Sequence, residues 1–356
     1  GAGWTNGMNV ADFEREFSAF SGAKHSVAVS TGSSAIEVSL RSLGLKQGQV
    51  VFAPTLTAPP TVYSSAYAGA NVVLVDSRRS DLGMDPDDLT DKIERFASWD
   101  PGAIIPVHIG GIISPAIERI LDIGRQAGIP VIEDCAHAHG ATYDDVHAGR
   151  RGLSGTFSFF LTKVLSAGEG GIITTDNDEL CEQARIVRDY GKDSSGFHVR
   201  DGSNWRLDEF TAAVALWQTM DAPNILSQRR ATAVLYDSML SDVEGISLLP
   251  MPNGVVSSYY KYIVFLDPSI DRTKLKKVMD GKYGVALSGE VYANPCHREP
   301  VFLKNPSVLN VNDAFPQADE ISKSHICLPL YQGMTGEETA YVSESLKKAL
   351  SESRMS

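Results

Sequence analysis

The sequence has few cysteines, no excess of basic residues and no long apolar run, and each absence excludes a class of protein. Its four cysteines are far apart and lack CxxC spacing, which favours scattered reduced thiols in a cytoplasmic protein. With 44 acidic and 32 basic residues the net charge is -12, which argues against nucleic acid or an anionic membrane as the main partner. No apolar run reaches the roughly 18 residues of a membrane-spanning helix. The first residues lack the basic and apolar stretches of a signal peptide, so we expect none.

The length and composition indicate a globular enzyme with more than one domain. A chain of 356 residues is too long for one small core, and it has room for roughly two domains of ~100–200 residues. Hydrophobic residues make up 43% and charged residues 21%, which are ordinary values for a soluble globular enzyme.

The first part of the chain alternates short apolar strands with helices. An opening amphipathic helix is indicated by apolar residues at steps of three and four, namely Val10, Phe13, Phe17 and Phe20. The predicted strands are Ser26–Ser30, Val50–Ala53, Val72–Asp76, Ala103–Val107, Pro130–Glu133, Thr156–Phe160 and Ile172–Thr175. The predicted helices between them include Ser34–Leu43, Ile117–Ala127 and Asp178–Tyr190. This alternation predicts a largely parallel sheet covered on both faces, and the short connection between the last two strands predicts at least one antiparallel strand.

The pattern changes after about residue 220. Helices are predicted at Ile225–Leu240, Thr273–Met279 and Glu337–Leu350, with a strand at Tyr260–Leu266. The last helix begins with a capping box, in which Thr335 is the cap and Glu338 its reciprocal partner. We therefore predict a large α/β domain over residues 1–220 and a smaller α+β domain over residues 221–356.

A lysine lies between the last two predicted strands of the large domain. Lys163 follows an aromatic strand and precedes a turn of small residues, Ser166–Gly171. A lysine buried between strands costs free energy unless it is neutralised or has a partner. Ser158 points to the face of its strand opposite the phenylalanines, and a turn would bring it to the same pocket as Lys163. The alternative is a lysine at a hairpin tip in solvent.

The segment Ser30–Ala35 ends one predicted strand and opens a helix. Its turn, Gly32–Ser34, directs free N–H groups, two hydroxyls and the positive end of the helix dipole to one place, which suits a phosphate. The segment is neither a Walker loop nor a GxGxxG motif, and a plain helix cap would look the same.

Two adjacent acids, Glu133 and Asp134, follow a buried strand at its carboxyl end, where open α/β sheets bind ligands. If Asp134 is enclosed there, it needs a cationic or proton-donating partner. One alternative is that Asp134 caps the following segment. Another is a metal bound by Asp134, His137 and His139, although on a helix the two imidazole rings would diverge by about 200°.

These three features together point to one cofactor. Lysine forms a Schiff base with the aldehyde of pyridoxal phosphate, a carboxylate keeps its pyridine nitrogen protonated, and a helix N-terminus holds its phosphate. Few other cofactors need all three parts. We therefore predict pyridoxal 5'-phosphate at Lys163, Asp134 and the Ser33–Ser34 turn, and we expect no metal.

The same landmarks, in this order, resemble the DegT/DnrJ/EryC1/StrS family of sugar aminotransferases over nearly the whole chain. The matching segments are Gly3–Gly7, Ser30–Ala35, Pro106–His108, Glu133–Gly140, Phe157–Phe159, Thr162–Lys163, Gly168–Gly171 and Asn204–Leu207. The resemblance implies a pyridoxal-phosphate enzyme of fold type I, similar to aspartate aminotransferase. Such an enzyme has a mostly parallel mixed central sheet and works as a homodimer with shared active sites.

Position by position, the resemblance implies roles for the residues noted above. Lys163 matches the lysine that forms the Schiff base and acts as general acid and base, and Asp134 matches the acid at the pyridine nitrogen. The other implied cofactor-binding residues are Gly32, Ser33, Ser34, His137, Ser158 and, from the partner subunit, Asn204. The implied substrate residues are Trp4, Thr5 and His297.

One position departs from the family pattern. The family has an aromatic residue that stacks on the cofactor ring shortly after the proline of the second strand. In this chain the position falls at Ala58, which is followed by Pro59 and Pro60. Either another group covers the ring, or that face is more open.

The resemblance implies transfer of an amino group from glutamate or glutamine to a ketone of a nucleotide-linked sugar or a cyclitol. Such a reaction belongs to amino-sugar, aminocyclitol or antibiotic biosynthesis. A dehydratase branch of the family has histidine in place of the lysine, so Lys163 favours transamination. The alternatives are a dehydratase or epimerase of the same family and a non-catalytic regulator that binds the cofactor.

Overall fold

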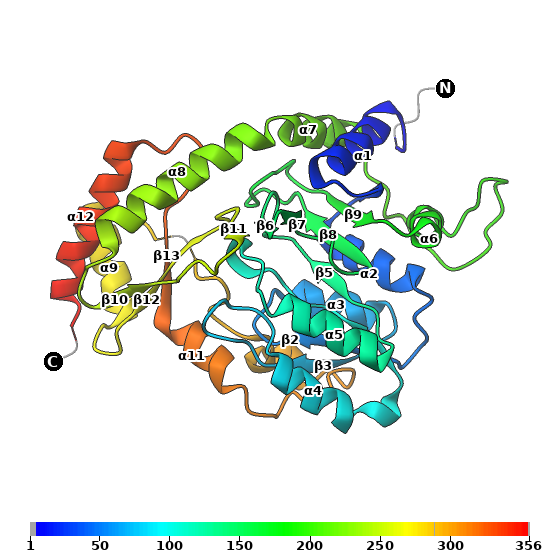
Figure 1. Ribbon diagram of the computed structural model, residues 1–356, viewed down its shortest axis with the longest axis horizontal. Helices are drawn as coiled ribbons and strands as arrows, with labels where there is room; N and C mark the ends of the chain where they lie inside the picture. The colour runs from blue at the N-terminus through cyan, green and yellow to red at the C-terminus, as the bar shows by residue number, and fades with distance from the viewer. Residues whose placement is uncertain (1–4, 288, 355–356) are drawn as a thin grey trace.

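The core of the larger part of the protein is a mixed sheet (Figure 1). The computed structural model describes residues 5–287 and 289–354. Two groups of hydrogen-bonded strands, β1-β9-β8-β5 and β3-β2-β4, are joined by the parallel bridges Ile104–Val131 and Val107–Asp134. The strands are β1 (His25–Val29), β2 (Val50–Pro54), β3 (Asn71–Val75), β4 (Pro101–Ile104), β5 (Ile132–Asp134), β8 (Ser154–Ser158) and β9 (Gly171–Thr175).

The direction of the strands agrees with the sequence. The pairs β2–β3, β2–β4 and β5–β8 are parallel. Strand β9 is antiparallel to both β8 and β1, because only a turn connects it to β8 and no helix can return the chain to a parallel start. The predicted α/β fold with a mostly parallel mixed sheet is confirmed.

Helices cover both faces of this sheet. Val27 and Val29 of β1 pack with helices α2 and α6 on one face, whereas Ala28 between them packs with α1 on the other. This alternation follows from the two-residue period of a strand. The helices of this part are α1 (Met8–Ser21), α2 (Gly32–Ser42), α3 (Pro59–Tyr67), α4 (Pro86–Arg95), α5 (Ile117–Ala127), α6 (Asp178–Arg188) and α7 (Glu209–Met220).

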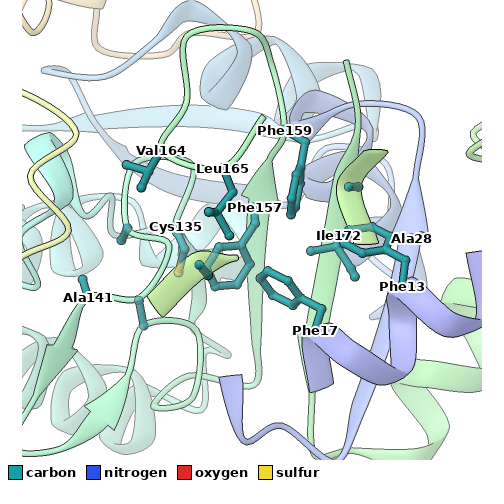
Figure 2. Packing of buried hydrophobic residues seen from close by; sticks show 14 of the residues in the cluster. Phe13, Phe17, Ala28, Cys135, Ala141, Phe157, Phe159, Val164, Leu165 and Ile172 are labelled. Carbon is teal, nitrogen blue, oxygen red and sulfur yellow. The ribbon is translucent and has the colours of Figure 1, made fainter. Parts of the chain in front are cut away.

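The apolar face of α1 fixes the strand that leads to Lys163. Phe13 and Phe17 are fully buried, as the periodicity of the opening helix predicts. The ring of Phe17 lies 5.0 Å from that of Phe157, and the ring of Phe13 lies 5.0 Å from that of Phe159. Figure 2 shows these rings packed together beside Ile172 of β9. The packing on α1 therefore holds the strand before Lys163 through its phenylalanines, on the face opposite Ser158.

The smaller part of the protein is an antiparallel sheet covered by helices. Strand β12 (Tyr262–Leu266) pairs with β10 (Ile246–Leu248) and β13 (His325–Leu328). Helices α8 (Ala222–Leu240), α9 (Arg272–Tyr283) and α12 (Gly336–Glu352) contribute to its core. The predicted capping box of Thr335 and Glu338 at α12 is confirmed. In Figure 1, α8 runs from the end of α7 to this second sheet.

A segment late in the sequence packs back on the large sheet. It includes α10 (Pro300–Leu303) and leads to α11 (Pro316–Ser324). The N–H of Val72 donates to the carbonyl of Ser307 at 2.6 Å, and the N–H of Leu74 donates to the side chain of Asn310 at 2.8 Å. The domain boundary at residue 220 stays a prediction, since contacts across it are extensive.

Shorter elements complete the described chain. They are the strands β6 (Thr142–Tyr143), β7 (Val146–His147) and β11 (Val255–Val256) and the 3-10 turns Ala97–Trp99, Ile109–Gly111 and Cys296–Arg298. All four cysteines are buried, and none of them forms a disulfide in the described structure. Over the described residues, no helix combines the length and the apolar character needed to cross a membrane.

Candidate active site

A cavity of about 310 Å³ opens at the carboxyl ends of β5 and β8, next to the start of α2. Such strand ends are where open α/β sheets bind ligands. The residues that line it are Thr31, Gly32, Ser33, Ile36, Ala58, Pro60, Thr61, Asp134, Ala136, Ser158, Phe160, Lys163 and Glu169. The cavity thus unites Lys163, Asp134, Ser158 and the start of α2, which are far apart in the sequence.

The start of α2 forms one wall of the cavity. Thr31 caps the helix: its hydroxyl accepts from the N–H of Ser34 at 3.0 Å, and the Ser34 hydroxyl accepts from the N–H of Thr31 at 2.8 Å. Ser34 is therefore used inside the cap and is buried, whereas Gly32 and Ser33 line the cavity. The first N–H groups of a helix have no intrahelical partner, so this wall is suited to an anion.

A glycine is required at position 32. A Cβ atom there would lie 2.6 Å from the Cβ of Ser158 on β8, which is far closer than two carbon atoms can approach. The close approach places the Ser158 side chain directly against the first turn of α2. Both residues consequently face the same ligand position.

Asp134 is buried at the end of β5 and has two hydrogen-bond donors. The Thr61 hydroxyl donates to its Oδ2 at 2.9 Å, and the N–H of Ala136 donates to its Oδ1 at 3.1 Å. Thr57 contacts the Thr61 hydroxyl at 2.9 Å. Burial raises the pKa of Asp134 above its ordinary value, although these donors and the charge of Lys163 oppose the shift. A cation placed at this carboxyl would favour its ionised form.

Lys163 faces the cavity and is not a hairpin-tip lysine in solvent. Burial lowers its pKa to about 8, the charge of Asp134 acts in the opposite direction, and the charge of Lys261 lowers the pKa further. Its Nζ lies 5.0 Å from the centroid of the Tyr260 ring. An amine with this pKa is partly unprotonated near neutral pH, as a nucleophile must be.

His137 is a neutral ring held between aromatic side chains. It stacks on Tyr260 with 3.9 Å between ring centroids and an angle of 17°. Its Nδ1 accepts from the N–H of Gly110 at 3.4 Å, and its Nε2 lies 3.3 Å from the hydroxyl of Tyr292. Burial and the charge of Lys163 keep the pKa of His137 well below its ordinary value. The neutral tautomer thus carries its proton on Nε2.

Three contributors to the site were not found in the sequence: Thr61, Tyr260 and Tyr292. Tyr292 lies close to Ala58, the position where this chain lacks the aromatic residue of the family pattern. The backbone amide of Ala58 hydrogen-bonds the Tyr292 hydroxyl, and burial and the Asp134 charge raise the pKa of Tyr292 well above its ordinary value. The only signal in the sequence was the aromatic pair Tyr259-Tyr260 at the start of a strand.

The neighbouring acid Glu133 has a structural set of partners. It is fully buried, and its oxygens accept from His108 at 2.8 Å and from the N–H groups of Gly149, Arg151 and Gly152 at 2.7–3.0 Å. Burial would raise its pKa, but His108 and the backbone donors bring the pKa below its ordinary value.

Metal-ligating side chains do not gather at the predicted alternative site. In the described part of the chain, the one grouping with suitable spacing is His108, Glu133 and Cys135. Asp134, His137 and His139 form no such group. His139 lies among the rings of Phe157 and Phe159, its two ring nitrogens have no partner in the described structure, and burial lowers its pKa to about 3.

Those predicted substrate and partner residues that the structure describes lie outside the cavity lining. Both ring nitrogens of His297 are engaged, Nδ1 with Thr55 at 2.8 Å and Nε2 with Asp319 at 3.1 Å. Thr5 forms a bridge beside α7, and Asn204 is exposed. Trp4 lies outside the described residues. Within one chain, therefore, Thr5, Asn204 and His297 do not join the group around Lys163, and the assignment of all four residues stays a prediction.

Comparison with known proteins identifies the same group of enzymes from sequence and from structure. The sequence model of the DegT/DnrJ/EryC1/StrS aminotransferase family matches residues 1–347. The chain is 33% identical over 341 residues to a pleiotropic regulatory protein of Geobacillus stearothermophilus, covering 96% of this chain and 89% of that protein. It is 31% identical over 352 residues to dTDP-3-amino-3,4,6-trideoxy-alpha-D-glucose transaminase of Micromonospora megalomicea subsp. nigra, covering 97% and 90%. The crystal structure of a DegT DnrJ EryC1 StrS aminotransferase from Brucella abortus superposes with a TM-score of 0.90 at 27% identity, covering 98% and 91%.

Proposed function

The chain belongs to the DegT/DnrJ/EryC1/StrS aminotransferase family, and on this premise we propose that it aminates a ketone of a nucleotide-linked sugar or a cyclitol. The family membership makes it a pyridoxal-phosphate-dependent aminotransferase. One observation carries the proposal: Lys163, Asp134 and the first turn of α2 line a single cavity. The amino donor is glutamate or glutamine.

The residues present fit pyridoxal phosphate. The N-terminus of α2 with Gly32 and Ser33 suits a phosphate, and Ser158 lies against it. Among the described residues no cation forms an ion pair with the buried Asp134 carboxyl, and a protonated pyridine nitrogen would supply one. We assign Lys163 to the Schiff base with the cofactor aldehyde, because it is the one lysine among the residues that line the cavity.

Each residue then has a defined task. The cofactor, when bound, carries the amino group and accepts the electron pair of a broken C–H bond. Asp134, oriented by Thr61 and the N–H of Ala136, holds the proton on the pyridine nitrogen. Lys163 moves a proton between two carbon atoms, for which a pKa of about 8 is close to the pH of the reaction. His137 stays neutral and donates a hydrogen bond from Nε2 to the Tyr292 hydroxyl.

Amination of a sugar is supported by the relatives. The Micromonospora protein, named as a dTDP-amino-sugar transaminase, aligns over 97% of this chain. We assign acceptor recognition to the segments at residues 192–202 and 293–306 and to the predicted residues Trp4, Thr5 and His297. A place in amino-sugar, aminocyclitol or antibiotic biosynthesis follows from this class of product.

A homodimer completes the proposed site. One side of α7 is apolar and exposed at helical spacing, with Val214 48%, Trp217 59% and Met220 62% exposed. Its opposite side, Ala212 and Ala215, is buried in the core. Large apolar side chains at this spacing favour a protein interface. In the dimer, Asn204 would reach the phosphate of the partner's cofactor. A cytoplasmic location stays a prediction from the reduced cysteines.

A spectroscopic experiment tests the function. The protein loaded with pyridoxal phosphate should show a visible absorption band that glutamate or glutamine bleaches, and Lys163→Ala should lack the band. The pyridoxamine form is then mixed with keto sugars and ketocyclitols, and product analysis separates amination from dehydration or epimerisation. Normal turnover by Lys163→Ala would refute the assignment.

A regulatory role is the second candidate. It is favoured by the 33% identity to a protein named as a pleiotropic regulatory protein. A cofactor-loaded protein whose band no amino donor bleaches would support this candidate and contradict transamination.

A further inference from the structure

A second lysine shares an aromatic ring with Lys163. The Nζ atom of Lys163 lies 5.0 Å from the centroid of the Tyr260 ring, and the Nζ atom of Lys261 lies 5.5 Å from the same centroid. The two ammonium groups are therefore no farther apart than the sum of these distances. Each is attracted by the negative face of the ring. The ring of Tyr260 thus lies close to both Lys163, the lysine assigned to the reaction, and a second cation, Lys261.

The position of this second cation is set by packing. His137 stacks on the Tyr260 ring at 3.9 Å. Arg229 donates from Nη2 to the carbonyl oxygens of Tyr259 at 2.9 Å and Tyr260 at 3.0 Å. Ser258 donates to the carbonyl of His137 at 2.8 Å. The segment that contains Lys261 is thereby held against the large sheet through its contacts with His137.

Lys261 borders a second cavity of about 230 Å³, together with Tyr259 and Asp237. Lys163 lines the first cavity and Lys261 the second, and the ammonium groups of both lysines lie over the ring of Tyr260. Asp237 accepts a hydrogen bond from the Tyr262 hydroxyl at 2.6 Å. Across the described residues, no carboxylate forms an ion pair with Lys261.

The proposed reaction needs a cation in this place. Glutamate brings two carboxylates to Lys163, while the lining of the first cavity contains two acids, Asp134 and Glu169, and Lys163 as its one cation. That cation is committed to the cofactor. Arg229 directs its donors to three carbonyl oxygens, of Tyr259, Tyr260 and Leu330. Lys261 is a second ammonium group over the ring that Lys163 contacts, and among the described residues it has no carboxylate in an ion pair.

We infer that Lys261 is a donor-recognition residue whose ammonium group binds a carboxylate of the incoming amino acid. The inference rests on the proposed aminotransferase function. The contact is a charge-assisted hydrogen bond in a partly buried place, where such bonds are strong. It holds the donor with its amine toward Lys163 and leaves the chemical step to that residue.

The test is the first half-reaction under single-turnover conditions. Wild type, Lys261→Met, Lys261→Arg and the control Lys348→Met, an exposed lysine on α12, are loaded with pyridoxal phosphate. Bleaching of the visible band is followed against glutamate and glutamine concentration. We expect Lys261→Met to raise the apparent Kd for glutamate about tenfold or more, a larger change than in the rate at saturation, on which the Lys261 charge acts through the pKa of Lys163. Lys261→Arg, which keeps the charge, and Lys348→Met should resemble wild type.

The two donors report which carboxylate is bound. A loss confined to glutamate assigns Lys261 to the side-chain carboxylate, and a loss shared with glutamine assigns it to the α-carboxylate. An unchanged Kd for both donors in Lys261→Met overturns the inference, and so does weakened binding of the keto acceptor alone. If wild type is not bleached by any donor, the proposed function itself has failed, which is a different result.

Discussion

The Thr61 hydroxyl is the contact whose removal most directly tests the geometry of the Asp134 site. Thr61→Val keeps the shape of the side chain and removes the donor that lies 2.9 Å from Asp134 Oδ2. A hydrogen bond to a charged group contributes about 1.5–3 kcal/mol. At about 1.4 kcal/mol per factor of ten, its loss should weaken the binding of a cation-bearing ring about 10–100-fold.

The same loss should be visible in the titration of the carboxyl. Because the Thr61 hydroxyl lowers the pKa of Asp134, the valine variant should raise that pKa further above its ordinary value. The cofactor band should consequently be lost at a higher pH as the solution is acidified. Thr61→Ser keeps the donor and is the matched control.

The assay is an absorbance titration of the cofactor-free protein with pyridoxal phosphate, repeated across pH. Thermal unfolding of each variant without cofactor shows whether the fold is intact. The reasoning is refuted if Thr61→Val binds the cofactor like wild type, or if Thr61→Ser loses as much affinity as the valine variant.

Three further predictions concern the lysine, the glycine turn and the apolar helix. Because burial lowers the pKa of Lys163 to about 8, the neutral form of this lysine prevails above that pH. The rate of covalent capture of pyridoxal phosphate should therefore rise up to about pH 8 and then level off. A rate that continues to rise up to the ordinary pKa of lysine would contradict the burial. Gly32→Ala places a Cβ 2.6 Å from that of Ser158 and should destabilise the protein by about 1–3 kcal/mol in urea unfolding. Gly281→Ala in helix α9, where a Cβ meets nothing within 4 Å, should be neutral or stabilising, and equal effects of the two changes would refute the close approach. Trp217→Asp on α7 should shift the protein from dimer to monomer in analytical ultracentrifugation. Tyr341→Asp, which changes a similarly exposed residue on α12, should leave the dimer intact. A dimer that persists in Trp217→Asp would place the interface elsewhere.

Elements with a strong period could be predicted from the sequence, and their ends could not. Ile117–Ala127 is helical over the predicted residues, and the opening helix buries its predicted phenylalanines. In contrast, the predicted strand Ala103–Val107 is β4 at Pro101–Ile104. Apolar periodicity records which residues are buried, whereas the last residue of a strand depends on where its neighbour ends. Helix α7 has apolar side chains on both its buried and exposed sides, so the periodicity gave no signal for it.

The parts of the site that we predict to be catalytic could be recognised in the sequence because each has a local signature. A glycine-serine turn before a helix, acids after a buried strand and a lysine after an aromatic strand can each be recognised alone. The missing aromatic at Ala58 was equally visible. Tyr292, which lies near that position, could not be recognised from the sequence, because it comes from a loop more than 200 residues later in the chain.

The sequence by itself determined the alternating α/β pattern and the antiparallel last strand, and it predicted that Lys163 and Asp134 belong to one site. Only the tertiary structure decided that Thr61 supports Asp134, that Tyr260 joins Lys163 to Lys261, and that both ring nitrogens of His297 are engaged away from the cavity. The physical reason is the range of the interactions. Hydrophobic periodicity and helix capping act within a few residues, but hydrogen bonds and ring contacts join residues that meet only once the sheet and its helices have packed.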